Sequence, residues 1–329
     1  MMVVVTLLWI SVHTLTPPRS PPVRCGEVRS LCELHRRAAA SCCSVSCCLG
    51  EETVATIELV TETASAAARA AGALMRARIG AEVIETKAGF ADLLTEVDGE
   101  CQAVIERIVR SRHPTHRFLG EEQVAPGAAA AAAALGELAD AAWLWLVDPI
   151  DGTTNFASGL PLSAVSIGVA HAGELVAGVV YDPFRDELFA GRVGAQTTLN
   201  GAPVHVSNAA GLAEVVLAAG CPPNPRSLAP SLRGICQLAP HVRTVRLLGS
   251  AAVMMAWVSC GRLTAYFEPD LNAWDTAAGA VLVRGAGGCV SGLDGANFSV
   301  TTRTLLCSNG LTHAALLERL AAANAVSLD

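Results

Sequence analysis

Two carboxylates and a hydroxyl follow an apolar run near the middle of the chain, in the order Asp148, Asp151 and Thr153. Carboxylate oxygens are ligands that suit Mg²⁺. Gly152 and Thr153 add backbone amides that can face an anion at the start of the next element. For a bare Asp-Gly pair, the alternative is an ordinary turn with an Asp cap. The residue types and their spacing predict a site that holds a metal ion and a phosphate together.

An apolar strand must position this group. The run 143–147 is rich in residues that favour strands, and Pro149 stiffens its exit. We therefore expect Asp148 and Asp151 to project from the end of a strand. Apolar runs separated by turn residues predict an antiparallel meander after it, with strands at 164–170, 175–181 and 187–191.

Helices are predicted before and after the meander. Apolar residues recur at three- and four-residue steps from Val54 until Gly80 stops the pattern, and a second helix follows Thr95. The alanine run between Gln123 and Trp143 is either an exposed loop or a short helix. Beyond residue 200 strands and helices mix, with strands at 215–219 and 263–268 and helices at 250–260 and 275–284. This order favours sheets packed between helices.

The block from Asp148 to Phe156 resembles the signature of the inositol monophosphatase family of metal-dependent sugar-phosphate phosphatases. Two further blocks match the family in its order, namely 92–98 followed by 118–122, and 274–279. The resemblance runs from about residue 51 to the end. It implies a layered αβαβα sandwich of the α+β class, with the active site between two halves. Residues 51–199 would form an N-terminal α+β half that carries metal-binding motifs, and residues 200–329 a C-terminal α/β half.

The same resemblance implies a set of metal ligands. Glu121, Asp148 and the backbone carbonyl of Ile150 would bind one Mg²⁺, and Asp148, Asp151 and Asp275 a second. Glu121 would also serve a third, looser ion. Two carboxylates about 4 Å apart repel by roughly 4 kcal/mol at an effective dielectric near 20, so a cluster of four demands cations or protons.

Asp98 and Thr153 match the family pair that orients and helps to deprotonate the attacking water. A threonine hydroxyl is too weak a base alone and needs the carboxylate and the metal. Each acidic residue also has a structural alternative. Asp98 and Asp275 could be helix N-caps, and Glu121 with Glu122 could be a solvated acidic pair.

Substrate contacts follow from the family pattern as well. Glu268 matches the position at which inositol-type enzymes hydrogen-bond a substrate hydroxyl, and such a carboxylate suits a polyol or an amine. Lys87 aligns with a lysine near the site in relatives, although a lone lysine is usually on the surface. The remaining contacts implied for the phosphate and the pocket are Gly152, Thr153, Gly249, Ser250, Ala251 and Asp275. Trp274 is predicted to be core. The sequence departs from the family at 221–241 and 269–272, where relatives vary with substrate.

These matches predict a Mg²⁺-dependent phosphomonoesterase that hydrolyses inositol 1-phosphate or a related sugar phosphate, such as L-galactose 1-phosphate. A metal-activated water would attack directly, and Li⁺ would inhibit. Histidinol phosphate, a 3'-phosphonucleotide or fructose 1,6-bisphosphate are alternative substrates within the family. A non-catalytic regulatory member of the fold is the alternative of another class, but such a protein should have lost a ligand. The glycines at 285–288 lack the spacing of a dinucleotide site.

The composition of the chain limits the classes of binding partner. The chain has 329 residues, is 52% hydrophobic and carries a net charge of -7 without a Lys/Arg-rich run. A nucleic-acid surface is therefore not expected, and the partners are a small phosphate ester and, as in relatives, a second copy of the chain. The apolar start at 2–12 is too short to span a membrane, which takes roughly 20 residues.

The N-terminal extension, residues 1–50, stands apart from the family match. It is poor in acidic residues and crowded with cysteines, in the pairs 42–43 and 47–48. We interpret it as a disordered tail or an organellar transit peptide. A misassigned start codon is the alternative, so the predicted location is the cytoplasm or an organelle such as a plastid. The six scattered cysteines of the core are expected to be reduced.

Overall fold

The structure is a computed structural model that describes residues 51–86, 93–222 and 224–326. By its contacts the chain separates into residues 1–48 and 49–329, and the second unit alone contains the described residues. Its α-helices are α2 (Glu51–Arg78), α3 (Glu96–Arg112), α4 (Ala128–Gly136), α5 (Thr153–Ala157), α6 (Pro225–Leu238), α7 (Ala251–Ser259), α8 (Ala273–Gly285) and α9 (His313–Ala322). Two 3₁₀ helices are η1 (Glu121–Gln123) and η2 (Leu212–Glu214).

A seven-stranded sheet occupies the N-terminal part of this unit, in the order β3-β4-β5-β6-β7-β8-β9. Strands β3 and β4 are parallel, and every later neighbour pair is antiparallel. Its strands are β3 (Arg117–Gly120), β4 (Trp143–Asp151), β5 (Ala164–His171), β6 (Glu174–Asp182), β7 (Glu187–Arg192), β8 (Thr198–Leu199) and β9 (Ala202–Pro203). A separate hairpin pairs β1 (Val83–Thr86) with β2 (Leu93–Thr95). The meander β5-β6-β7 confirms the prediction from the alternating runs.

A five-stranded sheet follows, in the order β11-β10-β12-β14-β13. Strand β10 lies parallel to β11 and β12, whereas β14 is antiparallel to both β12 and β13. Its strands are β10 (Val216–Ala219), β11 (Thr244–Arg246), β12 (Ala265–Glu268), β13 (Cys289–Ser291) and β14 (Leu305–Ser308).

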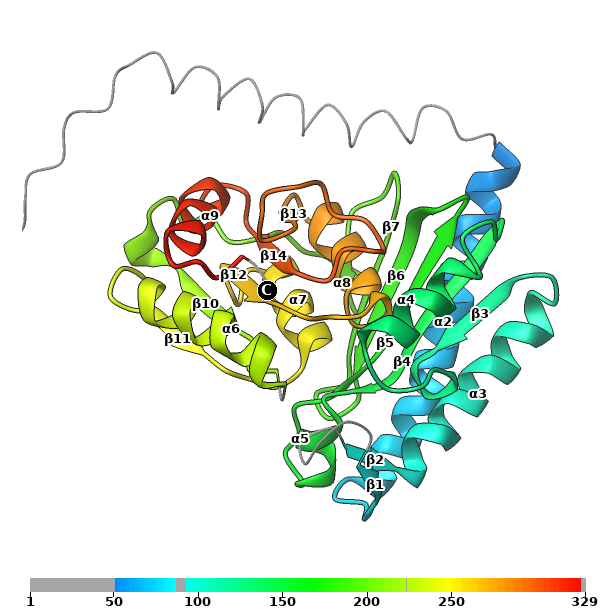
Figure 1. Cartoon of the computed structure of the whole chain (residues 1–329). Coiled ribbons are helices and arrows are strands. Elements are labelled where there is room, and N and C mark those ends of the chain that lie inside the picture. Colours follow the sequence, from blue (N-terminus) through cyan, green and yellow to red (C-terminus); the bar gives the residue numbers. More distant parts are fainter. Residues whose placement is uncertain (1–50, 87–92, 223, 327–329) are drawn as a thin grey trace, which may run out of the picture. The chain divides into compact units, whose positions relative to one another are not determined.

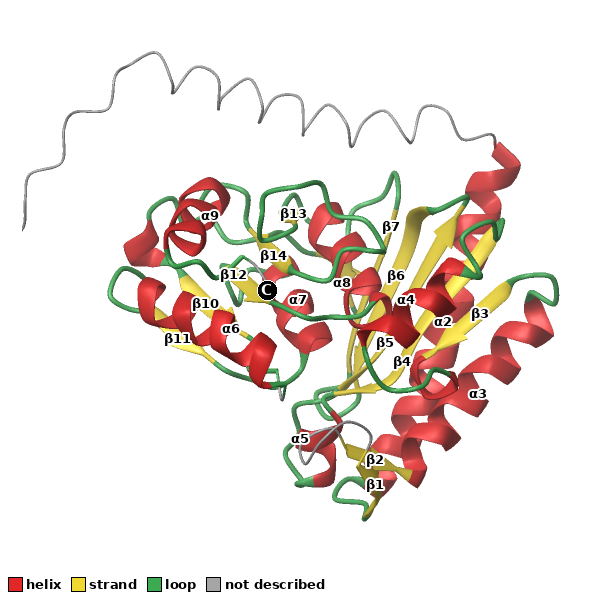
Figure 2. Cartoon of the chain, viewed as in Figure 1, coloured by secondary structure: helices red, strands yellow, loops and turns green. Residues whose placement is uncertain are grey.

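Helices and sheets alternate in five layers. Helices α2 and α3 pack on one face of the seven-stranded sheet, and α8 packs on the other (Figure 1). Helices α7 and α8 also contact the five-stranded sheet, whose far side is packed by α6 and α9 (Figure 2). This arrangement confirms the predicted αβαβα sandwich. The division of the chain at about residue 200 stays a prediction.

Small residues let α8 approach the seven-stranded sheet closely. A Cβ added at Gly168 of β5 would lie 2.5 Å from the Cβ of Ala277, and one added at Gly178 of β6 would lie 2.5 Å from the carbonyl oxygen of Ala278. Both distances are shorter than van der Waals contact, so glycine is required at the two strand positions. This close packing fixes the distance between α8 and the sheet. It therefore also fixes the position of Asp275, which lies in the first turn of the helix.

Most of the predicted helices and strands are confirmed within two or three residues. The alanine run forms the short helix α4, which confirms the second of the two predicted conformations. The sequence analysis did not predict helices α5, α6 and α9 or strands β1, β2, β3, β8, β9, β11, β13 and β14. In the part of the chain that is described, no helix has the length and apolar character needed to cross a membrane.

Candidate active site

Strand β4 carries both aspartates of the signature, and a β-bulge aims them the same way. Asp148 pairs with Ser166 of β5 and Asp151 pairs with Ala164, with a register shift between the two pairs. Ser166 and Ala164 are two residues apart and share one face of the sheet, so their partners share it as well. Without the bulge, the three-residue spacing would place the two carboxylates on opposite faces.

The bulge also corrects the predicted end of the strand. Strand β4 does not stop before Asp148 but continues to Asp151. Pro149 is tolerated because a bulge interrupts the ladder hydrogen bonds that proline cannot donate. The hydroxyl of Ser166 donates to the carbonyl of Trp274 in α8 at 3.0 Å, which identifies the shared face as the one that meets α8. Trp274 itself is buried, as predicted for a core residue.

Asp275 enters the same layer from the first turn of α8. Asn272 is the N-cap of this helix, and the carboxylate of Asp275 accepts its backbone N–H at 2.7 Å. Asp275 therefore stands three residues inside the cap, in a capping-box position. Its alternative role as the N-cap itself was wrong, because the helix begins earlier, at Ala273.

Glu121 opens η1, which directly follows β3. Strands β3 and β4 are parallel, so their carboxyl ends lie at the same edge and Glu121 emerges beside Asp148. The side chain of Gln102 in α3 accepts the backbone N–H of Glu122 at 2.9 Å. It occupies the space that a side chain at Gly120 would need. Gln102 was missed, because nothing in a helical pattern marks one polar residue as a support for a distant turn.

The four acidic side chains interact electrostatically. Burial raises the pKa of Asp148 well above its usual value, and the charges of Glu121, Asp151 and Asp275 raise it further. Burial also raises the pKa of Asp275, and it raises the pKa of Asp151 to about 6. In the described part of the chain, the neighbours that act most strongly on Asp148 are all acidic. Ionising such a cluster is costly unless cations compensate it.

The donor set fits Mg²⁺ in its chemistry. It consists of two buried carboxylates, Asp148 and Asp151, and two partly exposed ones, Glu121 and Asp275, whose charges repel one another. Carboxylate oxygens are ligands that hard divalent cations take. As the side chains stand, no three His, Cys, Asp or Glu residues within the described ranges are grouped closely enough to hold one ion. Three of the four carboxylates instead accept backbone N–H groups. The carbonyl of Ile150 accepts the Thr153 hydroxyl at 3.0 Å and keeps a second lone pair.

Asp98 and Thr153 lie within reach of one another. The hydroxyl of Thr153 is 3.3 Å from Oδ1 of Asp98. The other oxygen of Asp98 accepts the backbone N–H of Thr95 at 2.9 Å and its hydroxyl at 2.6 Å. Thr95 is the N-cap of α3, so the N-cap alternative for Asp98 was wrong. One carboxylate therefore fixes the start of the helix and faces Thr153.

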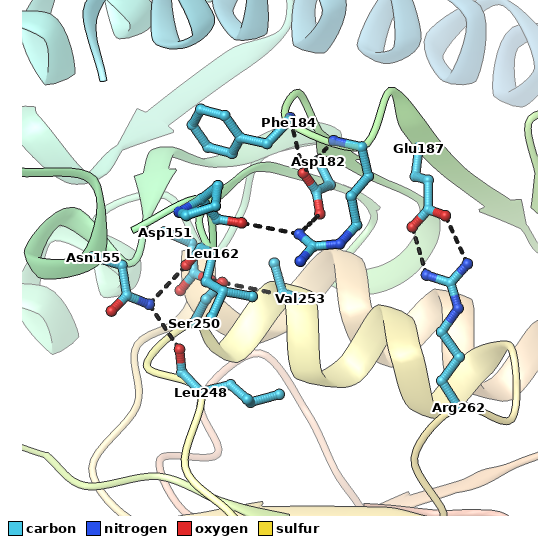
Figure 3. A network of polar contacts seen from close by, with 12 residues as sticks. Asp151, Asn155, Leu162, Asp182, Phe184, Glu187, Leu248, Ser250, Val253 and Arg262 are labelled. Atoms are coloured by element: carbon cyan, nitrogen blue, oxygen red, sulfur yellow. Dashed lines mark hydrogen bonds and ion pairs between the residues drawn. The ribbon is translucent and has the colours of Figure 1, made fainter. Parts of the chain in front are cut away.

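Asp151 connects the signature to the start of α7. Its Oδ1 accepts the backbone N–H of Ala251 at 3.2 Å, and its Oδ2 accepts that of Ala252 at 2.9 Å. The hydroxyl of Ser250 donates to Oδ2 as well (Figure 3). These donors are the unpaired groups of a helix N-terminus, which favour a negative partner. Ser250 and Ala251, predicted as pocket residues, thus lie directly against the carboxylate cluster.

The signature loop and the segment before α7 touch at two further points. Gly152 has φ +89°, and a Cβ added there would lie 2.9 Å from the carbonyl oxygen of Gly249. The amide of Asn155 donates to the carbonyls of Leu162 and Leu248, at 2.7 Å each (Figure 3). Asn155 was not predicted to have a role. Its place inside the signature block was the signal available.

Glu268 ends β12 and faces the same cluster. Burial raises the pKa of Glu268 to about 7, a hydrogen bond from Tyr266 opposes this, and the charge of Asp151 adds to it. Lys87 lies outside the described residues. All other site residues predicted from the sequence are in elements that meet at this cluster.

The shifted pKa values predict how metal binding depends on pH. The native pKa values of Asp148, Asp151 and Asp275 lie above the ordinary 3.8, so the metal-free folded state binds more protons than the unfolded chain. The contribution of these three groups to the stability of the metal-free folded state therefore falls as the pH rises from about 4 through their native pKa values. Mg²⁺ must displace those protons. We expect Mg²⁺ to raise the Tm more at pH 8 than at pH 5.5, in a thermal melt with and without EDTA. Equal shifts at both pH values would contradict the coupling.

The chain is similar in sequence to a family of known proteins. The sequence pattern of the inositol monophosphatase family matches residues 56–325. The inositol-1-monophosphatase of Synechocystis sp. is 39% identical over 263 residues, which cover 79% of this chain and 88% of the relative. The Arabidopsis thaliana protein named phosphatase IMPL1, chloroplastic, is 34% identical over 76% of this chain and 69% of its own.

A solved structure gives the same result for the fold. The inositol monophosphatase of Anabaena (Nostoc) sp. superposes with a TM-score of 0.70 at 33% identity, covering 82% of this chain and 97% of that one. Because the family match spans most of the chain, and because relatives are well above 30% identical, the chain belongs to the inositol monophosphatase family.

Proposed function

We propose that the protein is a Mg²⁺-dependent phosphomonoesterase that hydrolyses inositol 1-phosphate or a closely related sugar phosphate. The observation that carries this proposal is the group of four acidic residues, in which the charges of three act on Asp148, together with the Asp98–Thr153 pair. Glu121, Asp148, Asp151, Asp275 and the carbonyl of Ile150 would hold two Mg²⁺, with Glu121 also on a third. The bound ions would lower the pKa of a water molecule and offset charge on the leaving oxygen.

The residues of the chain supply the remaining steps. The hydroxyl of Thr153 can donate to Oδ1 of Asp98 while its oxygen accepts a hydrogen bond from water, so that Thr153 passes its own proton to Asp98 as it takes one from the water. Asp98 is oriented for this by its two bonds from Thr95. The backbone amides of Gly152 and Thr153 would face the phosphate. Hydrolysis by direct attack of water is consistent with an Asp-x-x-Asp spacing, which lacks the Asp-x-Asp pair of aspartyl-phosphate enzymes.

A polyol phosphate is favoured as the substrate. Glu268 supplies an acceptor for hydroxyl groups beside the acidic cluster, and the named relatives are inositol monophosphatases. Histidinol phosphate is the second candidate, because an amine also suits a carboxylate. A homodimer stays a prediction, as does the location, which is the cytoplasm or, if residues 1–50 are a transit peptide, an organelle.

The test is phosphate release by the full chain with Mg²⁺ across five esters. These are inositol 1-phosphate, L-galactose 1-phosphate, histidinol phosphate, fructose 1,6-bisphosphate and 3'-phosphoadenosine 5'-phosphate. We expect the highest kcat/KM for inositol 1-phosphate or L-galactose 1-phosphate, and inhibition by millimolar Li⁺. A higher value for one of the other three would correct the substrate. If a folded sample that binds Mg²⁺ turns over none of them, the non-catalytic alternative replaces the proposal.

A further inference from the structure

Glu268 is held in place by two residues to which the family pattern assigned no role. Tyr266 lies two positions earlier on β12, so both side chains point to the same side of the strand. Its hydroxyl donates to Oε2 of Glu268. Tyr266 is fully buried, with none of its surface exposed, whereas Glu268 is partly exposed. The tyrosine therefore cannot reach a substrate itself and acts through the carboxylate.

Gly220 closes the other side of the Glu268 carboxylate. A Cβ added at Gly220 would lie 1.7 Å from the carboxyl carbon of Glu268, so the side chain occupies the space that glycine leaves. The backbone there cannot move away easily. The N–H of Gly220 donates to the carbonyl of Phe267 at 3.0 Å, and its carbonyl accepts the hydroxyl of Ser231 in α6.

We infer that Tyr266 and Gly220 are positioning residues that preorganise Glu268 to accept hydroxyl groups of a polyol phosphate, and so set the substrate class. This inference rests on the proposed function. A carboxylate clamped between a buried phenol and a backbone has little freedom to turn toward solvent. It therefore loses little conformational freedom when a substrate hydroxyl binds. Gly220 also directly precedes the segment 221–241, in which the sequence analysis predicts a departure from the family.

A substitution with a matched control tests the role of the phenol. Tyr266→Phe removes only the hydroxyl. Tyr181→Phe removes the same group from another buried tyrosine, which donates to Asp186 at 2.8 Å on the other sheet. Each variant is assayed with inositol 1-phosphate and with p-nitrophenyl phosphate, whose leaving group carries no hydroxyl for Glu268. We expect Tyr266→Phe to raise KM for inositol 1-phosphate about tenfold, the effect of one hydrogen bond to a charged group. Its kcat/KM for p-nitrophenyl phosphate should stay at the wild-type value. Tyr181→Phe should leave kcat and KM unchanged for both substrates.

A second pair of variants keeps the test independent of the phenol. Gly220→Ala should displace the carboxylate and raise KM for inositol 1-phosphate at least as much. Gly99→Ala, in α3 with open space around the added Cβ, is its control. Equal losses for both substrates in Tyr266→Phe and Gly220→Ala would mean a general role in folding and would overturn the inference. A wild type that cleaves p-nitrophenyl phosphate but no polyol phosphate would instead refute the proposed substrate, and the inference with it.

Discussion

Asp148→Asn is expected to lower phosphate release by about a thousandfold or more, because metal binding contributes several kcal/mol to such reactions. The negative charges of Glu121, Asp151 and Asp275 all act on Asp148. It is also the residue proposed to bridge two ions. An amide in its place can still accept the N–H of Ile150, so the fold of the loop should survive.

The melting temperature of Asp148→Asn gives a second test, which needs no activity assay. Removing a buried charge that its neighbours repel should raise the Tm of the metal-free protein at pH 8. Mg²⁺ should then raise the Tm of the variant less than that of the wild type. Asp140→Asn, at an exposed position, is the control and should resemble the wild type in both measurements. An active Asp148→Asn variant with an unchanged response to Mg²⁺ would exclude the proposed metal site.

Periodicity predicted the elements that are regular and missed those whose signals conflict. The strands of the meander and helices α2 and α3 have uninterrupted patterns, so each was found. Helix α6 was not predicted, and it contains Pro230 and Gly234, two residue types that disfavour a helix interior. A start signal was nevertheless present, because Asn224 caps the helix and Pro225 follows it in the first position.

In the site too, some features could be predicted from the sequence and others could not. The residue types of the signature predicted the carboxylates, but not how three-residue spacing could aim two of them alike. Pro149 inside a strand was the available sign of a bulge, since proline in a sheet interior is confined to such places. The clamp on Glu268 was beyond sequence reasoning. It depends on the packing of Gly220 against Glu268, which are 48 residues apart and meet only because β10 and β12 are neighbours.

Thr153→Val is expected to lower kcat by a factor of about 10² to 10³, the usual contribution of a positioned proton acceptor. Valine preserves the shape of threonine but can neither donate to Asp98 nor accept a proton from water. None of the predicted metal-ligand atoms is removed, so the Mg²⁺ dependence of the Tm should stay near that of the wild type. KM should change little, because the loss is in the proton transfer.

Two further variants distinguish this role from a structural one. Thr153→Ser keeps the hydroxyl and should retain most of the wild-type kcat. Thr61→Val loses a comparable bond, from a hydroxyl to the carbonyl of Ile57 at 2.7 Å in α2, and should leave kcat unchanged. If Thr153→Ser is impaired and Thr153→Val keeps the wild-type kcat, the methyl packing of Thr153 matters more than its hydroxyl. The proton would then have to pass directly from water to Asp98, whose orientation by Thr95 would remain the feature that makes transfer feasible.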